Sequence, residues 1–107
     1  YQDKKIKLKE LIIDPKKGMS LQRHFKRDEI WFVSQGECKV KFKAVGDNEF
    51  HEHHIKLHDV FKVAKEDWHQ IFNPFAEECR IIEIQYGDET SEEDIERLEF
   101  YQGNNEK

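Results

Sequence analysis

Four polar side chains in two separate stretches of the sequence have the types and spacing of a metal site. Gln22 and His24 are two residues apart, Glu29 follows them, and His69 lies in a later stretch. Alternate residues of a β-strand point to the same face of a sheet, so Gln22 and His24 can converge on one point. Imidazole, carboxylate and amide donors suit a divalent ion, zinc first and otherwise manganese, iron, cobalt or nickel. We therefore expect Gln22, His24, Glu29 and His69 to bind a divalent metal ion.

Such a set of ligands leaves room for chemistry on the ion. With three or four protein donors, coordination positions stay open for water or for the oxygens of a substrate. This is the arrangement of a catalytic or ligand-binding site. Four further histidines invite the same interpretation, but they lack a carboxylate partner, and we interpret them as an exposed strand face. They are His51, His53, His54 and His58.

Runs of alternating apolar and polar residues, separated by turn residues, surround these candidates. One turn contains Pro15 and Gly18, and another is centred on Gly46. Ser91 and the acidic residues that follow it predict the start of a helix, because they match the N-cap and the first turn. We expect strands at residues 6–13, 19–24, 29–36, 37–45, 48–57, 60–63, 68–73 and 79–86.

Many short strands followed by one terminal helix are typical of an antiparallel β-barrel or jelly roll. We expect an all-β single domain over residues 1–107, ending in a short C-terminal helix with Ile95 and Leu98 on one face. Five aromatic residues are expected to fill the core and line the barrel. They are Trp31, Phe32, Phe42, Phe61 and Phe72.

The composition excludes several classes of protein. A formal net charge of −5 argues against a general nucleic-acid binder, and no apolar run is long enough for a membrane span. Cys38 and Cys79 are too few for a disulfide framework. We interpret them as reduced thiols in a cytoplasmic protein, with a single Cys38–Cys79 bridge as the alternative.

The ordered polar residues match a known pattern. The first motif of the cupin superfamily has a HxH pair, then Glu after three or four residues, then Gly after six more, and the second motif ends in His, three residues and Asn. This chain resembles that pattern, with Gln in place of the first His. The matching residues are Gln22, His24, Glu29 and Gly36 in the first motif and His69 and Asn73 in the second.

The Gln-His-Glu-His variant narrows the resemblance to phosphomannose isomerases. The segments SLQRH, E-x-W, V-S-Q-G, W-H-x-x-x-N-P, I-I-E-I-Q-Y-G-D and E-E-D-I-E-R, spread over residues 6–100, look like the type II phosphomannose isomerase domain. That domain often forms the C-terminal part of bifunctional mannose-1-phosphate guanylyltransferases. The resemblance implies a cupin barrel with a bound divalent metal. It also implies metal-dependent interconversion of mannose 6-phosphate and fructose 6-phosphate, with a sugar phosphate as the partner.

The resemblance also suggests which residues act on the substrate. Arg97 corresponds to the arginine of the family's EDDIVR-type segment and is a candidate for the phosphate or the proton-transfer region. Lys26 and Ile30 replace two family histidines. Strand alternation predicts that Lys26 faces the mouth beside His24, where it can supply a cation for a phosphate, and that Ile30 points away from Glu29.

Two other functions remain open. One is a metal-binding cupin that acts on another small molecule. The other is a non-catalytic sugar-binding or oligomerising module, favoured by Lys26, Ile30 and the absence of the family's arginine shortly after Tyr101. Glu83 and Gln85 share a strand face and are candidates to line the cavity. The charged strand at residues 5–13 is expected to be an edge through which a homodimer forms.

Overall fold

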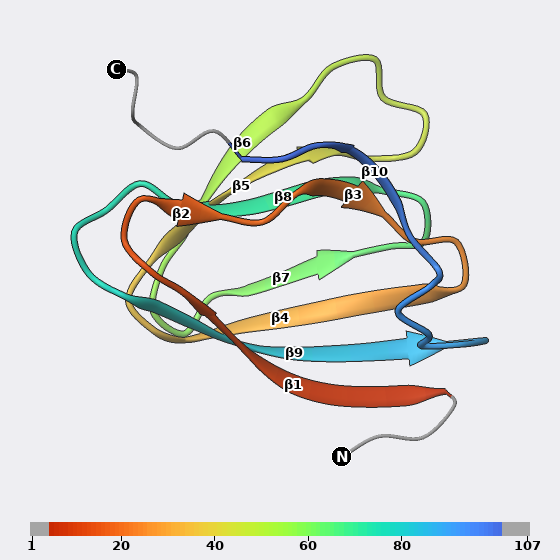
Figure 1. Ribbon diagram of the computed structural model, residues 1–107, viewed down its shortest axis with the longest axis horizontal. Helices are drawn as coiled ribbons and strands as arrows, with labels where there is room; N and C mark the ends of the chain where they lie inside the picture. Colours follow the sequence, from red (N-terminus) through yellow and green to blue (C-terminus); the bar gives the residue numbers. More distant parts are fainter. Residues whose placement is uncertain (1–4, 102–107) are drawn as a thin grey trace.

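The computed structural model describes residues 5–101, and every regular element in that range is a β-strand. Figure 1 shows the path of the chain through them. Residues 1–4 and 102–107, which include both ends of the predicted domain and the segment after Tyr101, lie outside the described residues. The strands are β1 (Ile6–Ile13), β2 (Lys17–Gly18), β3 (Leu21–Arg23), β4 (Arg27–Gln35), β5 (Cys38–Lys43), β6 (His51–Ile55), β7 (Val60–Val63), β8 (Trp68–Asn73), β9 (Cys79–Gly87) and β10 (Glu96–Glu99).

The strands form two antiparallel sheets that face each other as two layers (Figure 1). One sheet has the order β1-β9-β4-β7. The other has the order β10-β3-β8-β5-β6, with β2 also paired to β8. Strands that are neighbours in a sheet are mostly far apart in the sequence, as in a jelly roll. The predicted all-β jelly-roll barrel is therefore confirmed.

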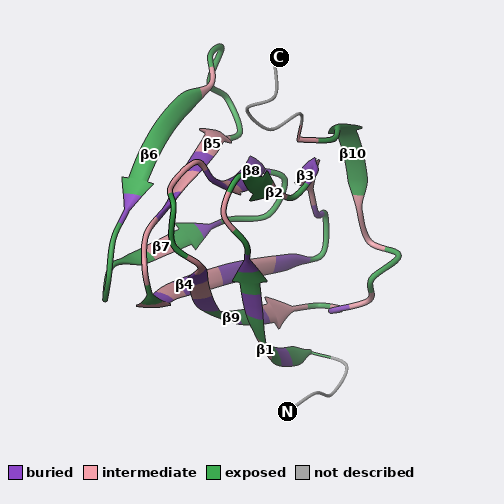
Figure 2. Ribbon diagram, turned by 60° about the vertical axis from the view of Figure 1, so that its left-hand side comes forward, coloured by how far each residue is buried: buried purple, intermediate pink, exposed green. Residues whose placement is uncertain are grey.

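Side chains alternate between the inside and the outside of the barrel along β4 and β9, which Figure 2 shows as stripes of burial. On β9, Ile81, Glu83 and Gln85 are buried, whereas Ile82 and Ile84 are exposed. Glu83 and Gln85 therefore share one face of the strand, as the sequence predicted. Each sheet therefore has one face toward the interior and one toward the surface.

The interior is apolar at one end of the strands and polar at the other. On β4 the buried positions run from Arg27 and Glu29 to Trp31 and Val33. The apolar end forms a single cluster, and the polar end carries the candidate site. The buried apolar cluster comprises Leu11, Ile13, Trp31, Val33, Cys38, Val40, Ile55, Val63, Ile71, Cys79 and Ile81.

Three of the five aromatic residues expected inside the barrel pack in or against this cluster, namely Trp31, Phe42 and Phe61. The expectation is wrong for the other two. Phe32 lies between two inward-facing residues of β4 and stacks on His58, and Phe72 stacks on Tyr101. Both are partly exposed. Alternation therefore decides their position more strongly than size or hydrophobicity does.

The predicted C-terminal helix is wrong. The cap interaction is present, since the Glu93 backbone N–H donates to Ser91 Oγ at 3.1 Å, but only a turn follows. Residues 96–99 then form β10, which pairs with β3. Leu98, predicted to lie on the buried helix face, is 58% exposed. Pairing with the free edge of β3 satisfies the backbone here, so tertiary context overrides the local helix signal.

Several strand boundaries also differ from expectation, and two of them lie near the candidate ligands. The sequence predicts one strand over residues 19–24. The structure has two shorter strands instead, β2 before this segment and β3 within it. β4 begins at Arg27, two residues before the predicted start at Glu29. β4 ends next to Gly36, whose φ is +74°. A Cβ there would clash with the Glu78 carbonyl oxygen, so the turn requires glycine.

Candidate metal centre

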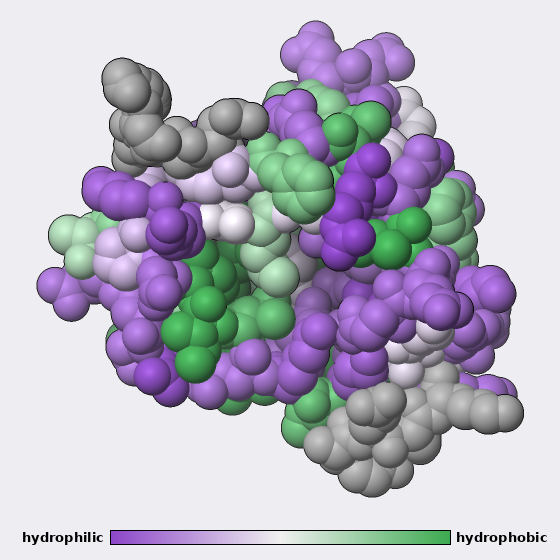
Figure 3. Space-filling view, in the orientation of Figure 1, coloured by the Kyte–Doolittle hydropathy of each residue, from purple (hydrophilic) through white to green (hydrophobic). Residues whose placement is uncertain are grey.

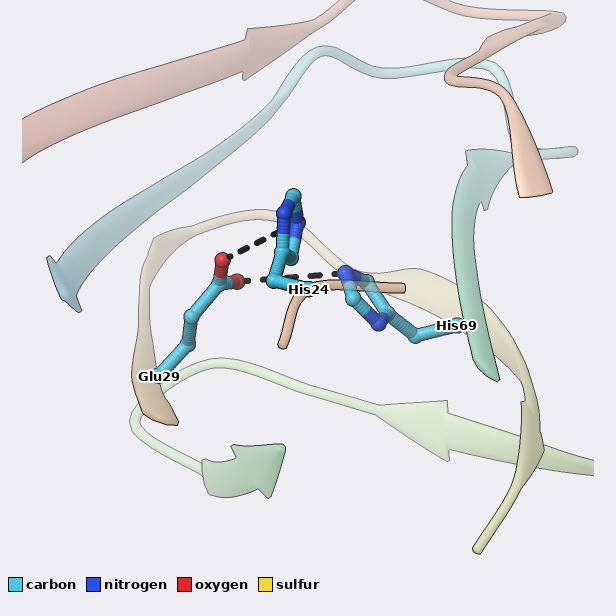
Figure 4. Close-up of side chains that lie close together, drawn as sticks. All are labelled: His24, Glu29 and His69. Carbon is cyan, nitrogen blue, oxygen red and sulfur yellow. Dashed lines mark ion pairs between the residues drawn. The ribbon is translucent and has the colours of Figure 1, made fainter. Parts of the chain in front are cut away.

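Three strands from both sheets bring the candidate ligands together. Gln22 lies on β3 and pairs with His69 on β8, and His24 follows directly after β3. Glu29 reaches the same point from β4 in the opposite sheet (Figure 4). Donor atoms of His24, Glu29 and His69 all lie within 4.8 Å of one another, and all three residues are buried. The convergence that the spacing predicted is therefore present in the fold.

Hydrogen bonds hold both imidazoles in one orientation. His24 Nδ1 donates to the Asp94 carbonyl oxygen at 2.7 Å, and His69 Nδ1 donates to the Asp67 carbonyl oxygen at 3.0 Å. Since a carbonyl only accepts, the proton of a neutral ring sits on Nδ1, and the lone pair of Nε2 is left for another partner. Such backbone contacts are the usual support of metal-binding histidines.

Both imidazoles are neutral at pH 7. Burial lowers the pKa of His24 to about 4, and the nearby Arg27 guanidinium lowers it further. Burial also lowers the pKa of His69 to about 4. A metal ion binds the neutral form of histidine, so neither ligand has to lose a proton first.

The geometry fits a divalent ion. His24 Nε2 lies 3.4 Å from Glu29 Oε2, and His69 Nε2 lies 4.0 Å from Glu29 Oε1. Two ligand atoms each about 2.1 Å from a tetrahedral ion are about 3.4 Å apart, so small side-chain shifts suffice. Gln22 lines the same cavity, and its amide nitrogen donates to Ser20 Oγ at 3.1 Å. These residues have the chemistry and positions to hold zinc or a similar ion.

The site opens into a cavity of about 110 Å³, enough for several water molecules. Of the residues expected in it, Arg97, Glu83 and Gln85 line the cavity. Figure 3 shows that hydrophilic side chains cover most of the face seen there, with a hydrophobic patch to the left of its centre. The lining comprises Lys9, Leu11, Met19, Ser20, Gln22, His24, Arg27, Glu29, Trp31, His69, Ile71, Glu83, Gln85, Glu92, Ile95 and Arg97.

Lys26 does not line this cavity. Its ammonium group pairs with Glu89 at 3.3 Å on the surface, and its side chain is 56% exposed. The prediction that Lys26 faces the mouth beside His24 is therefore wrong. Residues 24–26 form a turn between β3 and β4, so strand alternation does not apply there. Ile30 does point away from the buried Glu29, as predicted.

Arg27, which was not among the residues predicted for the site, is 4% exposed and lies among the candidate ligands. Its Nε donates to Glu29 Oε2 at 2.9 Å, and its Nη2 donates to His24 Nε2 at 3.1 Å. The sequence did contain a signal, because Arg27, Glu29 and Trp31 alternate on one strand. The predicted strand starts at Glu29 and therefore leaves Arg27 out.

A second buried carboxyl group, that of Glu83, lies beside the candidate ligand Glu29. Trp31 Nε1 donates to Glu29 Oε1 at 3.0 Å and to Glu83 Oε2 at 3.2 Å. Burial raises the pKa of Glu83 to about 7, and the negative charge of Glu29 adds to the effect. Gln85 Nε2 donates to Glu83 Oε1 at 2.9 Å. Gln85 Oε1 is buried and has no hydrogen-bond partner among the described residues.

Two other groups of residues that the sequence brought into question do not belong to the candidate metal site. Asn73, at the end of the second motif, is fully buried, and its side chain binds the backbone of Ile13, Phe75 and Glu77. It therefore closes a turn and does not reach the site. The second group of histidines forms no three-residue metal cluster within residues 5–101. His54 pairs with Glu37 instead.

The two layers, with a polar end that holds two histidines and a glutamate, define the cupin class of β-barrel. Solved structures support this fold. A Klebsiella pneumoniae protein with a double-stranded β-helix domain superimposes with a TM-score of 0.76 at 14% identity, over 92% of this chain and 79% of that one. Bacillus subtilis oxalate decarboxylase, which has Mn(II) centres, gives 0.75 at 20% identity, over 89% of this chain and 24% of that one. Staphylococcus aureus CapF, a capsular polysaccharide assembling protein, gives 0.77 at 19% identity, over 92% of this chain and 28% of that one.

The family follows from the sequence comparison. The chain belongs to the mannose-6-phosphate isomerase C-terminal family, whose model matches residues 1–100. A curated relative, mannose-1-phosphate guanylyltransferase 2 of Escherichia coli O157:H7, is 33% identical over 100 residues. The match covers 90% of this chain and 19% of that relative, so the chain spans about one fifth of the relative's length.

Within residues 5–101, no helix has the length and apolar character needed to cross a membrane.

Proposed function

We propose that this chain is a metal-dependent sugar-phosphate isomerase domain that interconverts mannose 6-phosphate and fructose 6-phosphate. The observation that carries the proposal is the convergence of His24, Glu29 and His69, with Gln22 beside them, at the polar end of a cupin barrel. Membership of the family supports the choice of substrate. Zinc is the proposed ion because two neutral imidazoles and a carboxylate suit it, with manganese, iron, cobalt and nickel as alternatives.

The reaction moves a proton between C1 and C2 of the sugar through a cis-enediol. A bound ion would polarise the substrate oxygens, which stabilises the negative charge that develops. The protein must also carry the proton. Glu83 lines the cavity beside Glu29 and is held there by Trp31 and Gln85. We propose Glu83 as the group that exchanges the proton, because a general base must lie within reach of the reacting carbon.

The substrate phosphate needs a cation held away from the metal. Arg97 is the proposed cation, because it lines the cavity and its Nε donates to Ser20 Oγ at 3.1 Å. Its two terminal nitrogens can then point toward a phosphate as a fixed donor fork. Lys26 lies outside the cavity, so Arg97 is the only one of the two sequence candidates that we propose.

The sugar hydroxyls also need partners. Gln85 Oε1 is a buried acceptor without a hydrogen-bond donor among the described residues, and it belongs to a side chain that lines the cavity. Leaving such an atom unpaired is costly, so a donor from a bound molecule would be favoured there. A polyhydroxyl substrate supplies such donors.

The test begins with the metal. Protein stripped with a chelator is reloaded separately with zinc, manganese, iron, cobalt and nickel, and bound metal is measured. Each form is then assayed for isomerisation of mannose 6-phosphate in a coupled assay. We expect a bound ion and turnover with at least one metal. Bound metal without turnover would reject the isomerase and leave a metal-binding cupin that acts on another molecule. A protein that cannot be loaded would favour a non-catalytic module.

We further propose a homodimer in the cytoplasm. β1 lies at the edge of its sheet, and the outer face of that sheet exposes Leu8, Ile12, Ile82 and Ile84, which supports association through this face. Light scattering during gel filtration tests the dimer, and a Leu8→Glu variant should run as a monomer. The cytoplasmic location is supported by cysteines that are all free and buried.

A further inference from the structure

The guanidinium of Arg27 contacts two of the candidate ligands, His24 and Glu29, and it is buried with them. It is the first residue of β4, and its side chain points inward beside Glu29. Its Nη1 also donates to the Ser91 carbonyl oxygen at 3.4 Å. The guanidinium is thus held by two side chains and the backbone of the segment before β10.

Arg27 contacts the same nitrogen and oxygen atoms that would have to coordinate a metal ion. Its Nη2 donates to His24 Nε2 at 3.1 Å, and the same nitrogen lies 2.9 Å from Glu29 Oε2. The neutral ring of His24 has a single lone pair on Nε2, because its Nδ1 proton is donated to Asp94. That lone pair cannot bind an ion and accept from Arg27 at once.

The charge of Glu29 also sets Arg27 and a metal ion in competition for the same site. Glu29 is 1% exposed, and a buried carboxylate without a positive partner is strongly unfavourable. In the metal-free protein Arg27 supplies that positive charge. A divalent ion between His24, Glu29 and His69 would supply it instead, and two cations at one carboxylate would repel each other.

We infer that Arg27 is the resident cation of the metal-free site, and that a metal ion binds by displacing its guanidinium from His24 and Glu29. The inference rests on the proposed metal site and adds a determinant of its affinity. The displaced guanidinium keeps acceptors nearby, since Ser91 already contacts it and the Glu92 carboxylate lines the same cavity.

The test compares metal affinity in three purified proteins at pH 7 after stripping with a chelator. They are the wild type, Arg27→Met and a control, Arg23→Met, which removes a surface guanidinium paired with Glu96 at 2.9 Å. Zinc is titrated against a chromophoric chelator of known affinity. We expect Arg27→Met to bind zinc about tenfold more tightly or better, because the competing cation is gone, and Arg23→Met to match the wild type.

Thermal unfolding gives a readout independent of activity. The stripped Arg27→Met protein should melt at a lower temperature than the stripped wild type, and zinc should raise its Tm by more than it raises that of the wild type. If the stripped variant does not fold, Arg27→Gln, which keeps N–H donors for Glu29 but removes the charge, replaces it in both measurements. A variant that folds only with zinc also supports the inference.

These measurements distinguish a failure of the inference about Arg27 from a failure of the proposed metal site. If the wild type binds zinc and the folded Arg27 variant binds it equally or more weakly, Arg27 supports the ligands and the inference is overturned while the metal site stands. If none of the folded proteins binds zinc or the other four metals, the metal site itself is rejected, and the inference falls with it.

Discussion

Gln22 and His69 lie directly opposite each other where β3 pairs with β8. This pairing joins the two separate stretches of sequence that carry the candidate ligands. The third component, Glu29, comes from β4 in the facing sheet. The candidate site therefore joins both layers of the barrel, and its geometry depends on how the sheets pack. Changes at the site are expected to affect metal binding and stability together.

Replacing His69 by Ala should abolish metal binding while the barrel still folds. The substitution removes a ligand and a hydrogen bond to the Asp67 carbonyl, so the free energy of unfolding of the metal-free protein should fall by about 1 to 3 kcal/mol. Metal content after reloading and chemical denaturation measure the two effects. His54→Ala, at an exposed pair with Glu37, is the control and should retain metal. Full metal content in His69→Ala would exclude this residue as a ligand.

Replacing Glu83 by Gln should slow the reaction without emptying the site. The amide cannot carry the proton, but it keeps the size of the side chain and an acceptor for Trp31. Turnover should fall by about 10² to 10⁴, the usual contribution of a general acid or base, whereas KM and metal content should change little. Steady-state kinetics of metal-loaded protein measure this. An active Glu83→Gln enzyme would mean that another group moves the proton.

The stability of the metal-free protein should decrease as the pH falls from about 6.5 toward about 4, because His69 has its pKa lowered over that range. A lowered histidine pKa means that the unfolded chain binds the proton more strongly, so the stabilising contribution is complete above 6.5 and is lost on acidification. The shift corresponds to about 3 kcal/mol, at about 1.4 kcal/mol for each pKa unit. His24 adds a change of the same sign.

Urea denaturation of wild type and His69→Gln at several pH values isolates this effect. The difference in unfolding free energy between the two proteins should be smaller at pH 4.5 than at pH 7. Glu83 has the opposite sign, since its raised pKa gives stability that is lost as the pH rises from 4.5 through about 7, but both proteins contain it. A difference that stays constant with pH would show that His69 titrates normally in the folded protein.

A polar substitution at Leu98 separates the strand β10 from the helix predicted there. Leu98 is 58% exposed, so Leu98→Thr should change the unfolding free energy by less than about 0.5 kcal/mol. On the buried face of a helix the same change would cost about 2 kcal/mol or more. Leu21→Ala, at a side chain that is 2% exposed, is the positive control. A large loss at Leu98 would contradict the exposed strand and favour the buried helix face.

The sequence by itself determined the features that depend on local periodicity. Alternation predicted the all-β class and the shared face of Glu83 and Gln85, because successive side chains of a strand must point to opposite faces. The spacing of the two motifs also predicted that His24, Glu29 and His69 lie together. Their role as metal ligands stays a prediction until a bound ion is measured.

Only the tertiary structure decided the features that depend on what lies opposite. The segment after Ser91 has helix signals, but the free edge of β3 offers backbone partners, and the chain becomes β10. Lys26 falls in a turn and leaves the cavity, whereas Arg27 begins the strand and enters it. One residue of register thus decides which cation faces the ligands, because a strand exchanges its faces with every residue and the start of β4 is set by its pairing with β9.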